Sequence, residues 1–341
     1  MRPLVSTLSE LQRPKAPTSG SPPGDAVGAG LLGNRRAGRG DRLFGGLALG
    51  AGLLVLLILA FIAVVTTQQA WPAFASEGFG FVTSDVWDVS NGRFGARALI
   101  FGTLVVSLIA VLIAVPVSIG IALFTTEIAG RRAKGPIGLV IDLLAAIPSV
   151  VYGLWGALVA GPALNEGVYK PLAGIVGDWP VLGAVFGGPT WAQSFMTAGV
   201  ILACMITPII TSLSRDVIQT VPSAQREAAL ALGATRWEMI CGSILPWSRS
   251  GITGAVMLGL GRAMGETIAV ALVIGNSKTI TSKIFSPGDA MAGTIANEFG
   301  EAVGTHRSAL IGLGVVLFVV TILVNMAATK IIARFDVGAK A

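Results

Sequence analysis

Six long apolar stretches, separated by polar and basic segments, organise this chain of 341 residues. Each stretch approaches or exceeds the roughly 20 residues that a helix needs to cross the hydrocarbon core of a bilayer. The pattern therefore predicts an all-α membrane protein with six transmembrane helices. The predicted spans cover roughly residues 44–66, 99–125, 137–159, 195–213, 252–275 and 310–333.

The first 43 residues differ from everything that follows. They are rich in Pro, Gly, Ser and Arg and have little hydrophobic periodicity, which predicts a disordered basic tail. The tail is too long, and the next apolar run too extended, for a typical signal peptide. We expect a membrane domain over residues 44–334 and a short cytoplasmic end over residues 335–341.

Basic residues fall mainly on one side of the predicted spans. The tail, the loops after the second and fourth spans, and the C-terminal end hold 17 of the 24 Lys and Arg residues. The positive-inside rule therefore predicts that both termini are cytoplasmic. The charged fraction is only 12%, against about 25% in soluble domains, so the net charge of +6 reflects loop charge beside membrane lipid rather than a nucleic-acid partner.

Few residues are suited to cofactor or enzyme chemistry. The two cysteines, Cys204 and Cys241, form no disulfide framework, and His306 is the only histidine. No HExxH or G-x-S-x-G motif supports an intramembrane enzyme. We therefore expect no catalytic residue, no metal site and no cofactor.

The fifth apolar stretch contains LGLGRAMGETIAVALVIG, residues 258–275, with Arg262 and Glu266 near its middle. A charge there costs on the order of 3 kcal/mol, so it should face the bundle or an aqueous path. Four residues apart on one helix face, the two side chains either form a buried ion pair or make an anion site. In the second interpretation Gly261 and Gly265 leave space, Arg262 meets the anion, and Glu266 holds Arg262 in place or, as a hydrogen-bond acceptor, favours an oxyanion that still carries a proton.

The most informative polar stretch is VPSAQREAALALGATRWEMICGSILP, residues 221–246, after the fourth span. Its first part predicts a helix that closes at Gly233 in a left-handed conformation. Thr235 and Glu238 have the spacing of a capping box for a second short helix, which Pro246 is expected to end. We predict a compact helical knob, suited to a partner's groove, on the cytoplasmic side.

This stretch resembles the EAA loop of importer-type ABC transporter permeases. The residues that carry the resemblance are Glu227, Ala228, Ala229, Gly233 and Leu245-Pro246. Ser243 departs from the apolar residue usual at its position. The resemblance implies that the loop docks into a cleft of the ATPase subunit and transmits its closure.

A wider resemblance, over roughly residues 44–334, is to the PstC family of permeases from phosphate-specific ABC importers. It implies the type I ABC importer permease fold, with a core permease module over about 97–331, and inorganic phosphate as the substrate. It also implicates Arg262 and Glu266 in transport. The stretches that carry it are residues 79–88, 101–127, 142–156 and 261–270.

The resemblance implies a multi-pass protein of the bacterial inner membrane with three kinds of partner: a PstA-like second permease, a PstB-like ATPase dimer and an extracytoplasmic phosphate-binding protein. The chain itself lacks a phosphate loop, because GNSKT at residues 275–279 does not have the G-x-x-x-x-G-K spacing. Two alternatives stay open: a permease for another oxyanion such as sulfate or molybdate, and a membrane scaffold that mainly signals phosphate status.

Overall fold

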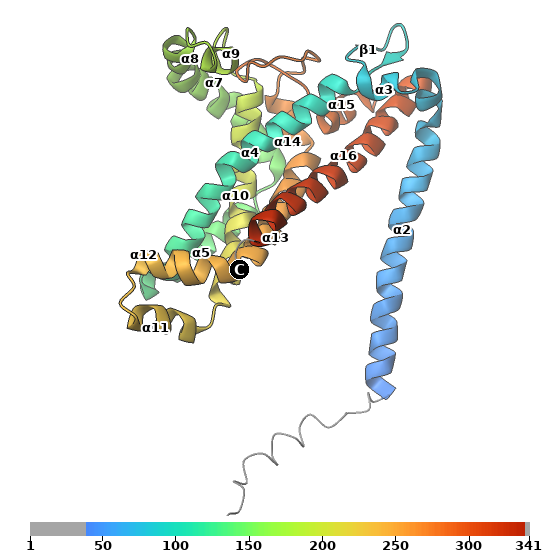
Figure 1. Ribbon diagram of the computed structural model, residues 1–341. Helices are drawn as coiled ribbons and strands as arrows, with labels where there is room; N and C mark the ends of the chain where they lie inside the picture. The colour runs from blue at the N-terminus through green and yellow to red at the C-terminus, as the bar shows by residue number, and fades with distance from the viewer. Residues whose placement is uncertain (1–38, 338–341) are drawn as a thin grey trace, which may run out of the picture. The chain divides into compact units, whose positions relative to one another are not determined.

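The computed structural model of the protein describes residues 39–337, with side chains over 43–130 and 132–331 (Figure 1). Residues 1–38 of the predicted tail and 338–341 of the predicted C-terminal end lie outside the described residues. Helix α2 begins at Arg39, a few residues before the predicted end of the tail.

Contacts along the chain divide it into two units, residues 1–61 and 62–341. In the described part of the first unit there is only the first section of α2 (Arg39–Glu77), which is apolar from Leu43 onward. Helix α2 continues well past the predicted end of the first span at residue 66. The hydroxyl groups of Thr66 and Thr67 donate to backbone carbonyl groups one turn earlier, so these polar residues do not interrupt the helix.

Four helices of the described chain are long and apolar enough to cross a membrane. Besides α2 they are α4 (Arg97–Leu123), α10 (Phe195–Gln219) and α16 (Gly304–Val337). Ser194 caps α10, because its hydroxyl oxygen accepts from the backbone N–H of Thr197. These helices correspond to the first, second, fourth and sixth predicted spans.

The third predicted span is broken. Helix α5 (Arg131–Ala145) is followed by the helical run Ser149–Val176, which begins with α6 (Ser149–Trp155). The two runs are bent by 87° relative to each other, and with this bent pair taken as one span the count reaches five. Pro148 lies at the break, with ψ of 139°, and directly precedes α6. Its missing N–H and its restriction of the preceding residue disfavour a continuous helix here. Helical structure then continues beyond the predicted boundary through η2 (Gly156–Ala160), α7 (Gly161–Leu164), η3 (Asn165–Tyr169) and α8 (Lys170–Val176), followed by α9 (Leu182–Phe186).

Helices α4 and α10 form the centre of the second unit, with α13 (Leu245–Gly265) beside them (Figure 1). Ala110, Ala114 and Ser118 are fully buried on α4 at four-residue spacing. These small side chains allow close approach, and the hydroxyl of Ser118 donates to the carbonyl oxygen of Thr207 on α10 over 3.1 Å.

At the end of the unit away from the 221–246 loop, short elements close over the long helices. They are α3 (Gly80–Thr83), the antiparallel pair β1 (Trp87–Asp88) and β2 (Arg93–Phe94), and α15 (Met291–Glu298). The loop before α15 crosses α4 so closely that a Cβ at Gly102 would lie 1.8 Å from the carbonyl oxygen of Asp289. The two short strands are the only β-strands among the described residues.

Candidate functional site

The stretch with Arg262 and Glu266 is not one helix, which corrects the prediction of a continuous fifth span. Helix α13 ends at Gly265, and α14 (Ile268–Val273) starts after a break of two residues. Glu266 has an extended backbone with ψ of 128°. The helical repeat that would place residues 262 and 266 on one face therefore stops between them.

Glu266 interacts with the helix that follows it. One carboxylate oxygen accepts from the backbone N–H of Ala269 over 3.4 Å, at the start of α14. A negative charge at this end of a helix is favourable, because the first N–H groups have no helical partner. The void that Glu266 lines has a volume of about 10 Å³. That is room for about one water molecule and not for an oxyanion.

Arg262 lies on a different cavity. Its volume is about 480 Å³, and it is lined from α10, α13 and α16 by Ile209, Met257, Leu258, Gly261, Arg262 and Asn325. The Arg262 side chain is exposed, and among the described residues it forms no ion pair. The predicted Arg262–Glu266 contact is therefore wrong for this conformation, while space beside Gly261 is present.

The glycines around Arg262 have different surroundings. A Cβ at Gly265 would meet nothing within 4 Å, so this position is open as predicted. Gly259, by contrast, packs on α10, where a Cβ would lie 2.6 Å from a methyl carbon of Ile210. The glycine-rich sequence thus serves helix packing on one side of α13 and leaves space on the other.

The loop of residues 221–246 has the two helices that its sequence predicts, α11 (Ser223–Ala231) and α12 (Arg236–Met239). Gly233 has φ of +85°, and two backbone hydrogen bonds close the turn around it, from Gly233 to Leu230 and from Ala234 to Ala229. This is a Schellman motif, which favours glycine because its left-handed backbone strains other residues. A Cβ would find open space here, so the backbone angle alone imposes the requirement.

The capping box is also confirmed. The hydroxyl oxygen of Thr235 accepts from the Glu238 backbone, and the Glu238 carboxylate accepts from the Thr235 backbone N–H over 2.7 Å. The backbone N–H and the hydroxyl of Thr235 hold the pKa of Glu238 below its usual value. Pro246, however, does not end the helix: the chain passes through the π-helical turn η4 (Ile240–Ile244) into α13, where proline is tolerated in the first turn.

The exposed surface of this loop combines apolar and charged groups. Leu232 is 89% exposed and Trp237 67% exposed, while Glu227 and Ala228 are exposed and Ala229 is half-buried. Large apolar side chains at the tip of a projecting loop are typical of a surface that a partner covers. The structure thus brings the four residues of the predicted coupling site onto one short helix and the turn that follows it.

Arg226 belongs to the base of this loop and not to its exposed surface. Its guanidinium lies 3.2 Å from a carboxylate oxygen of Glu127 and donates to the carbonyl oxygen of Ile218 over 2.9 Å. Glu127 lies in the π-helical turn η1 (Phe124–Ile128) that continues α4. The buried side chain of Glu127 thereby connects the first core helix to the loop.

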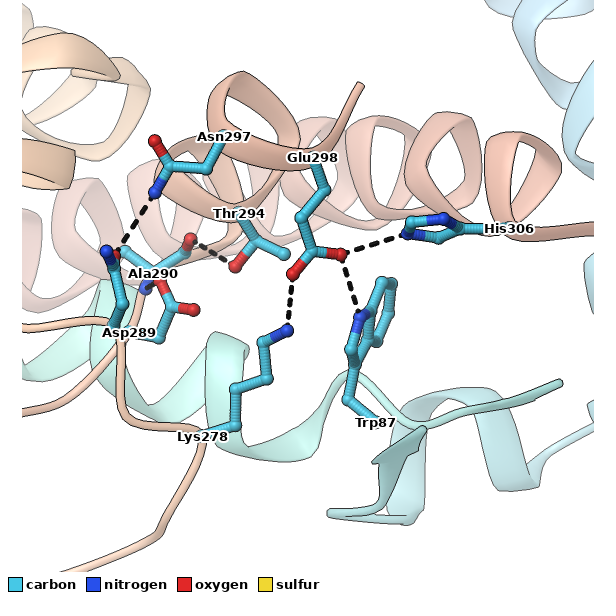
Figure 2. A network of polar contacts seen from close by, with 9 residues as sticks. Trp87, Lys278, Asp289, Ala290, Thr294, Asn297, Glu298 and His306 are labelled. Carbon is cyan, nitrogen blue, oxygen red and sulfur yellow. Dashed lines mark hydrogen bonds and ion pairs between the residues drawn. The ribbon is translucent and has the colours of Figure 1, made fainter. Parts of the chain in front are cut away.

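A third polar cluster, the outer network, lies around Glu298 at the end of α15 (Figure 2). One carboxylate oxygen of Glu298 accepts from Nε1 of Trp87 over 3.1 Å and lies 2.9 Å from Nε2 of His306, and the other accepts from Lys278. His306 also stacks on Phe94 with parallel rings. Burial raises the pKa of Glu298, but the hydrogen bonds from Lys278, His306 and Trp87 outweigh it, so the pKa is lowered.

Sequence reasoning missed two groups of residues here. The outer network joins positions from residue 87 to residue 306, and no spacing rule relates positions so far apart. Asn325 was missed because a single amide in an apolar helix is usually a packing residue. It is also far from Arg262 in the sequence, so nothing in the sequence indicates that the two residues line the same cavity.

Comparison with known proteins agrees with these findings. The profile of the family described as "Binding-protein-dependent transport system inner membrane component" matches residues 114–337. The phosphate transport system permease protein PstC of Mesorhizobium japonicum is 43% identical, covering 89% of this chain and 93% of that protein. The PstC of Xylella fastidiosa is 44% identical, covering 88% of this chain and 93% of that protein.

A solved structure shows the same fold. A bacterial alginate ABC transporter, crystallised with an alginate pentasaccharide-bound periplasmic protein, aligns with a TM-score of 0.57 and 17% identity. The alignment covers 87% of this chain and 96% of that chain. At this identity the likeness concerns the fold alone, and it agrees with the predicted permease fold. The count of six spans and the cytoplasmic position of the termini stay predictions.

Proposed function

On the premise that this chain belongs to the family of binding-protein-dependent transport system inner membrane components, we propose that it is the membrane-spanning subunit of an ATP-driven phosphate importer. The assignment of phosphate as the substrate rests on the 43% identity to a phosphate permease, over nearly the full length of both proteins. The partners follow from the same assignment: a PstA-like second permease, a PstB-like ATPase dimer that hydrolyses the ATP, and an extracytoplasmic phosphate-binding protein.

In this proposal Arg262 supplies the positive charge of the translocation pathway. Its guanidinium has five N–H donors in a planar fork and is always protonated, which suits the oxygens of phosphate. The cavity of about 480 Å³ beside it is large enough to admit the anion. Because Arg262 has no acidic partner among the described residues, an anion need not displace one before it binds.

Glu266 has a different role in this proposal from the one its spacing suggested. It lies at the junction of α13 and α14 and holds the first turn of α14 through Ala269. A junction of two helices is a place where backbone angles can change at low cost. We assign Glu266 to positioning Arg262 through the shape of this junction during alternating access.

The loop of residues 221–246 is the proposed contact with the ATPase. Leu232 and Trp237 offer apolar anchors, and Gly233 fixes the turn between the two helices. The Glu127–Arg226 ion pair gives the loop a direct connection to α4. Movement of the docked loop would then reach the core helices without passing through flexible chain.

The test is phosphate uptake by vesicles that contain the complete complex, with ATP inside and the binding protein outside. We expect ATP-dependent uptake of [33P]phosphate that excess sulfate does not reduce, and loss of that uptake in Arg262→Gln. Sulfate import without phosphate import would overturn the assignment of phosphate as the substrate. Unchanged uptake in Arg262→Gln, with only phosphate signalling lost, would overturn the anion site and favour the scaffold alternative.

A further inference from the structure

Asp142 on α5 and Arg215 on α10 form an ion pair between the first half of the bent third span and a central helix. Oδ1 of Asp142 lies 3.6 Å from Nη2 of Arg215. Ser212 bridges the two groups, because its hydroxyl donates to Asp142 over 3.2 Å and accepts from Arg215 over 3.4 Å. The pair ties α5 to α10, and neither the proposed anion site nor the proposed contact with the ATPase includes it.

The geometry of this pair allows it to open at low cost. Its N–O distance exceeds the roughly 2.7–2.9 Å of a close charge-assisted hydrogen bond, and the Asp142 side chain is 54% exposed. Arg215, which is only 15% exposed, has a second carboxylate within reach, since Asp216 lies 3.5 Å from its Nε. Opening the contact with Asp142 therefore leaves the guanidinium paired and the exposed carboxylate hydrated.

Gly138 on α5 gives the guanidinium its place against that helix. A Cβ at this position would lie 2.7 Å from Nη1 of Arg215, closer than real Cβ atoms approach another heavy atom. A cavity of about 360 Å³ lies beside the pair, and its lining includes Gly138, Asp142, Arg215 and Asp216. This cavity gives the guanidinium room to move away from α5.

Arg215 is close to the loop that is proposed to contact the ATPase. It lies one turn before α10 ends at Gln219, and the chain then enters the loop of residues 221–246. Arg226 of this loop donates to the carbonyl oxygen of Ile218 and so holds the loop to the end of α10. A displacement of the loop therefore acts first on the turn of α10 that carries Arg215.

Helix α5 connects in the other direction to the candidate anion site. It is followed by the 87° bend and by α6, which packs on α14. The contact is tight, because a Cβ at Gly153 would lie 2.9 Å from Cα of Ala269. Ala269 is the residue whose backbone N–H donates to Glu266. A movement of α5 can thus reach the junction of α13 and α14, next to Arg262.

We propose that the Asp142–Arg215 pair is a latch that holds this conformation and opens once in each transport cycle. This inference rests on the proposed function and deepens it, because it names the contact that regulates when the loop moves the anion site. While the latch is closed, α5 resists displacement of the end of α10, so the ATPase closes only when the loaded binding protein favours closure. Asp142 and Arg215 are positioning residues in this mechanism, since their effect on phosphate passes through the helices.

The experiment measures ATP hydrolysis by the complete complex in nanodiscs, without and with the phosphate-loaded binding protein, and phosphate uptake per ATP in vesicles. We expect Asp142→Asn to raise hydrolysis without the binding protein by about 2- to 5-fold, the factor that a half-exposed ion pair can supply, and to lower uptake per ATP. Adding Arg215→Gln should have no further effect, because both changes break one contact. If Asp142→Asn does not assemble, Gly138→Ala replaces it, because an added Cβ displaces the guanidinium and keeps every charge.

Asp216→Asn is the matched control. It removes the other carboxylate beside Arg215, at nearly the same distance and with similar exposure, but Asp216 is on α10 itself and joins no second helix. It should not raise hydrolysis in the absence of the binding protein. A rise equal to that in Asp142→Asn would overturn the latch, because the loss of either charge beside Arg215 would then suffice.

The outcomes separate the latch from the proposed function. If the wild type hydrolyses ATP but takes up no phosphate, the proposed function is wrong, and the hydrolysis assay still tests the latch. If the wild type takes up phosphate and Asp142→Asn hydrolyses ATP as the wild type does, the latch is wrong and the proposed function stands. A lower Tm with unchanged hydrolysis and unchanged uptake per ATP would also overturn the latch, because the pair would then only stabilise the fold.

Discussion

Lys278 and Arg262 are both basic residues in the part of the chain between α10 and α16, and the structure surrounds them differently. Lys278 donates to Glu298, which also accepts from Trp87 and contacts His306. Arg262 has no acidic partner among the described residues and lines a cavity instead. The satisfied network holds the outer segments together, whereas the unpaired guanidinium is available to a ligand.

The difference teaches how to distinguish structural from functional charge in a membrane protein. A buried polar group that is completely satisfied rigidifies its surroundings, and removing one member leaves the others unpaired. An unpaired cation contributes little to stability and is retained for another reason. Four predictions test this distinction, beginning with the largest expected effect.

The largest contrast is between two removals of positive charge, Arg262→Gln and Lys278→Gln. Arg262→Gln should reduce phosphate uptake by more than about 100-fold, because a charged, forked donor is lost from the site, while the Tm of the complex stays unchanged. Lys278→Gln should lower the Tm and leave most uptake. Uptake and thermal unfolding are measured on the same vesicle preparations. A fall in Tm in Arg262→Gln equal to that in Lys278→Gln would erase the distinction.

The loop of residues 221–246 is a third case, in which the proposed role depends on backbone geometry rather than on charge. Gly233→Val should weaken the coupling of ATP hydrolysis to uptake several-fold, because a residue with a side chain at φ of +85° costs about 1–2 kcal/mol and opens the turn. Gly242→Val is the control: Gly242 also has open space for a side chain but lies in the helical turn η4. The measurement is phosphate transported per ATP hydrolysed. Equal coupling in both variants would count against the docking role.

Within the outer network, Glu298→Gln should lower the free energy of unfolding by about 1–3 kcal/mol, because Lys278 loses its counter-charge and the amide cannot accept from all three partners. Glu301→Gln, exposed and close in sequence, should have no measurable effect. Denaturation in detergent, followed by tryptophan fluorescence, compares the two. Equal stability of both variants would mean that the network contributes nothing.

The smallest expected effect is on the pH dependence of stability. The folded-state pKa of Glu298 is lowered from its ordinary value of 4.5, so its contribution is present above pH 4.5 and is lost as the pH falls through the folded pKa. Asp289 acts in the opposite sense, because burial raises its pKa. The difference in Tm between wild type and Glu298→Gln therefore isolates Glu298, and it should shrink below about pH 4.5. A difference that stays constant down to pH 3 would contradict this assignment.

Local features were predictable wherever a few neighbouring residues decide them. The turn at Gly233 and the capping box of Thr235 and Glu238 follow from short-range rules, and both are present. Pro246 shows the limit of such rules, because proline ends a helix in one context and opens the first turn of another.

The candidate site was only partly predictable. The sequence identified Arg262 because a charge in an apolar stretch is conspicuous without any structure. It paired Arg262 with Glu266 because a regular helix would place them together, and the break at Glu266 removed that relation. Asn325 had no comparable signal, since an amide is ordinary until its surroundings are known.

The sequence by itself determined that the chain is an apolar helical membrane protein with a helical loop at 221–246 and an arginine within an apolar stretch, because hydrophobicity, turn chemistry and charge are local properties. Only the tertiary structure decided which groups meet: Lys278 with Glu298, Arg226 with Glu127, and Arg262 with Asn325 across one cavity. The reason is physical. Contacts between segments far apart in the chain depend on how helices break and pack, and these depend on the whole set of neighbours.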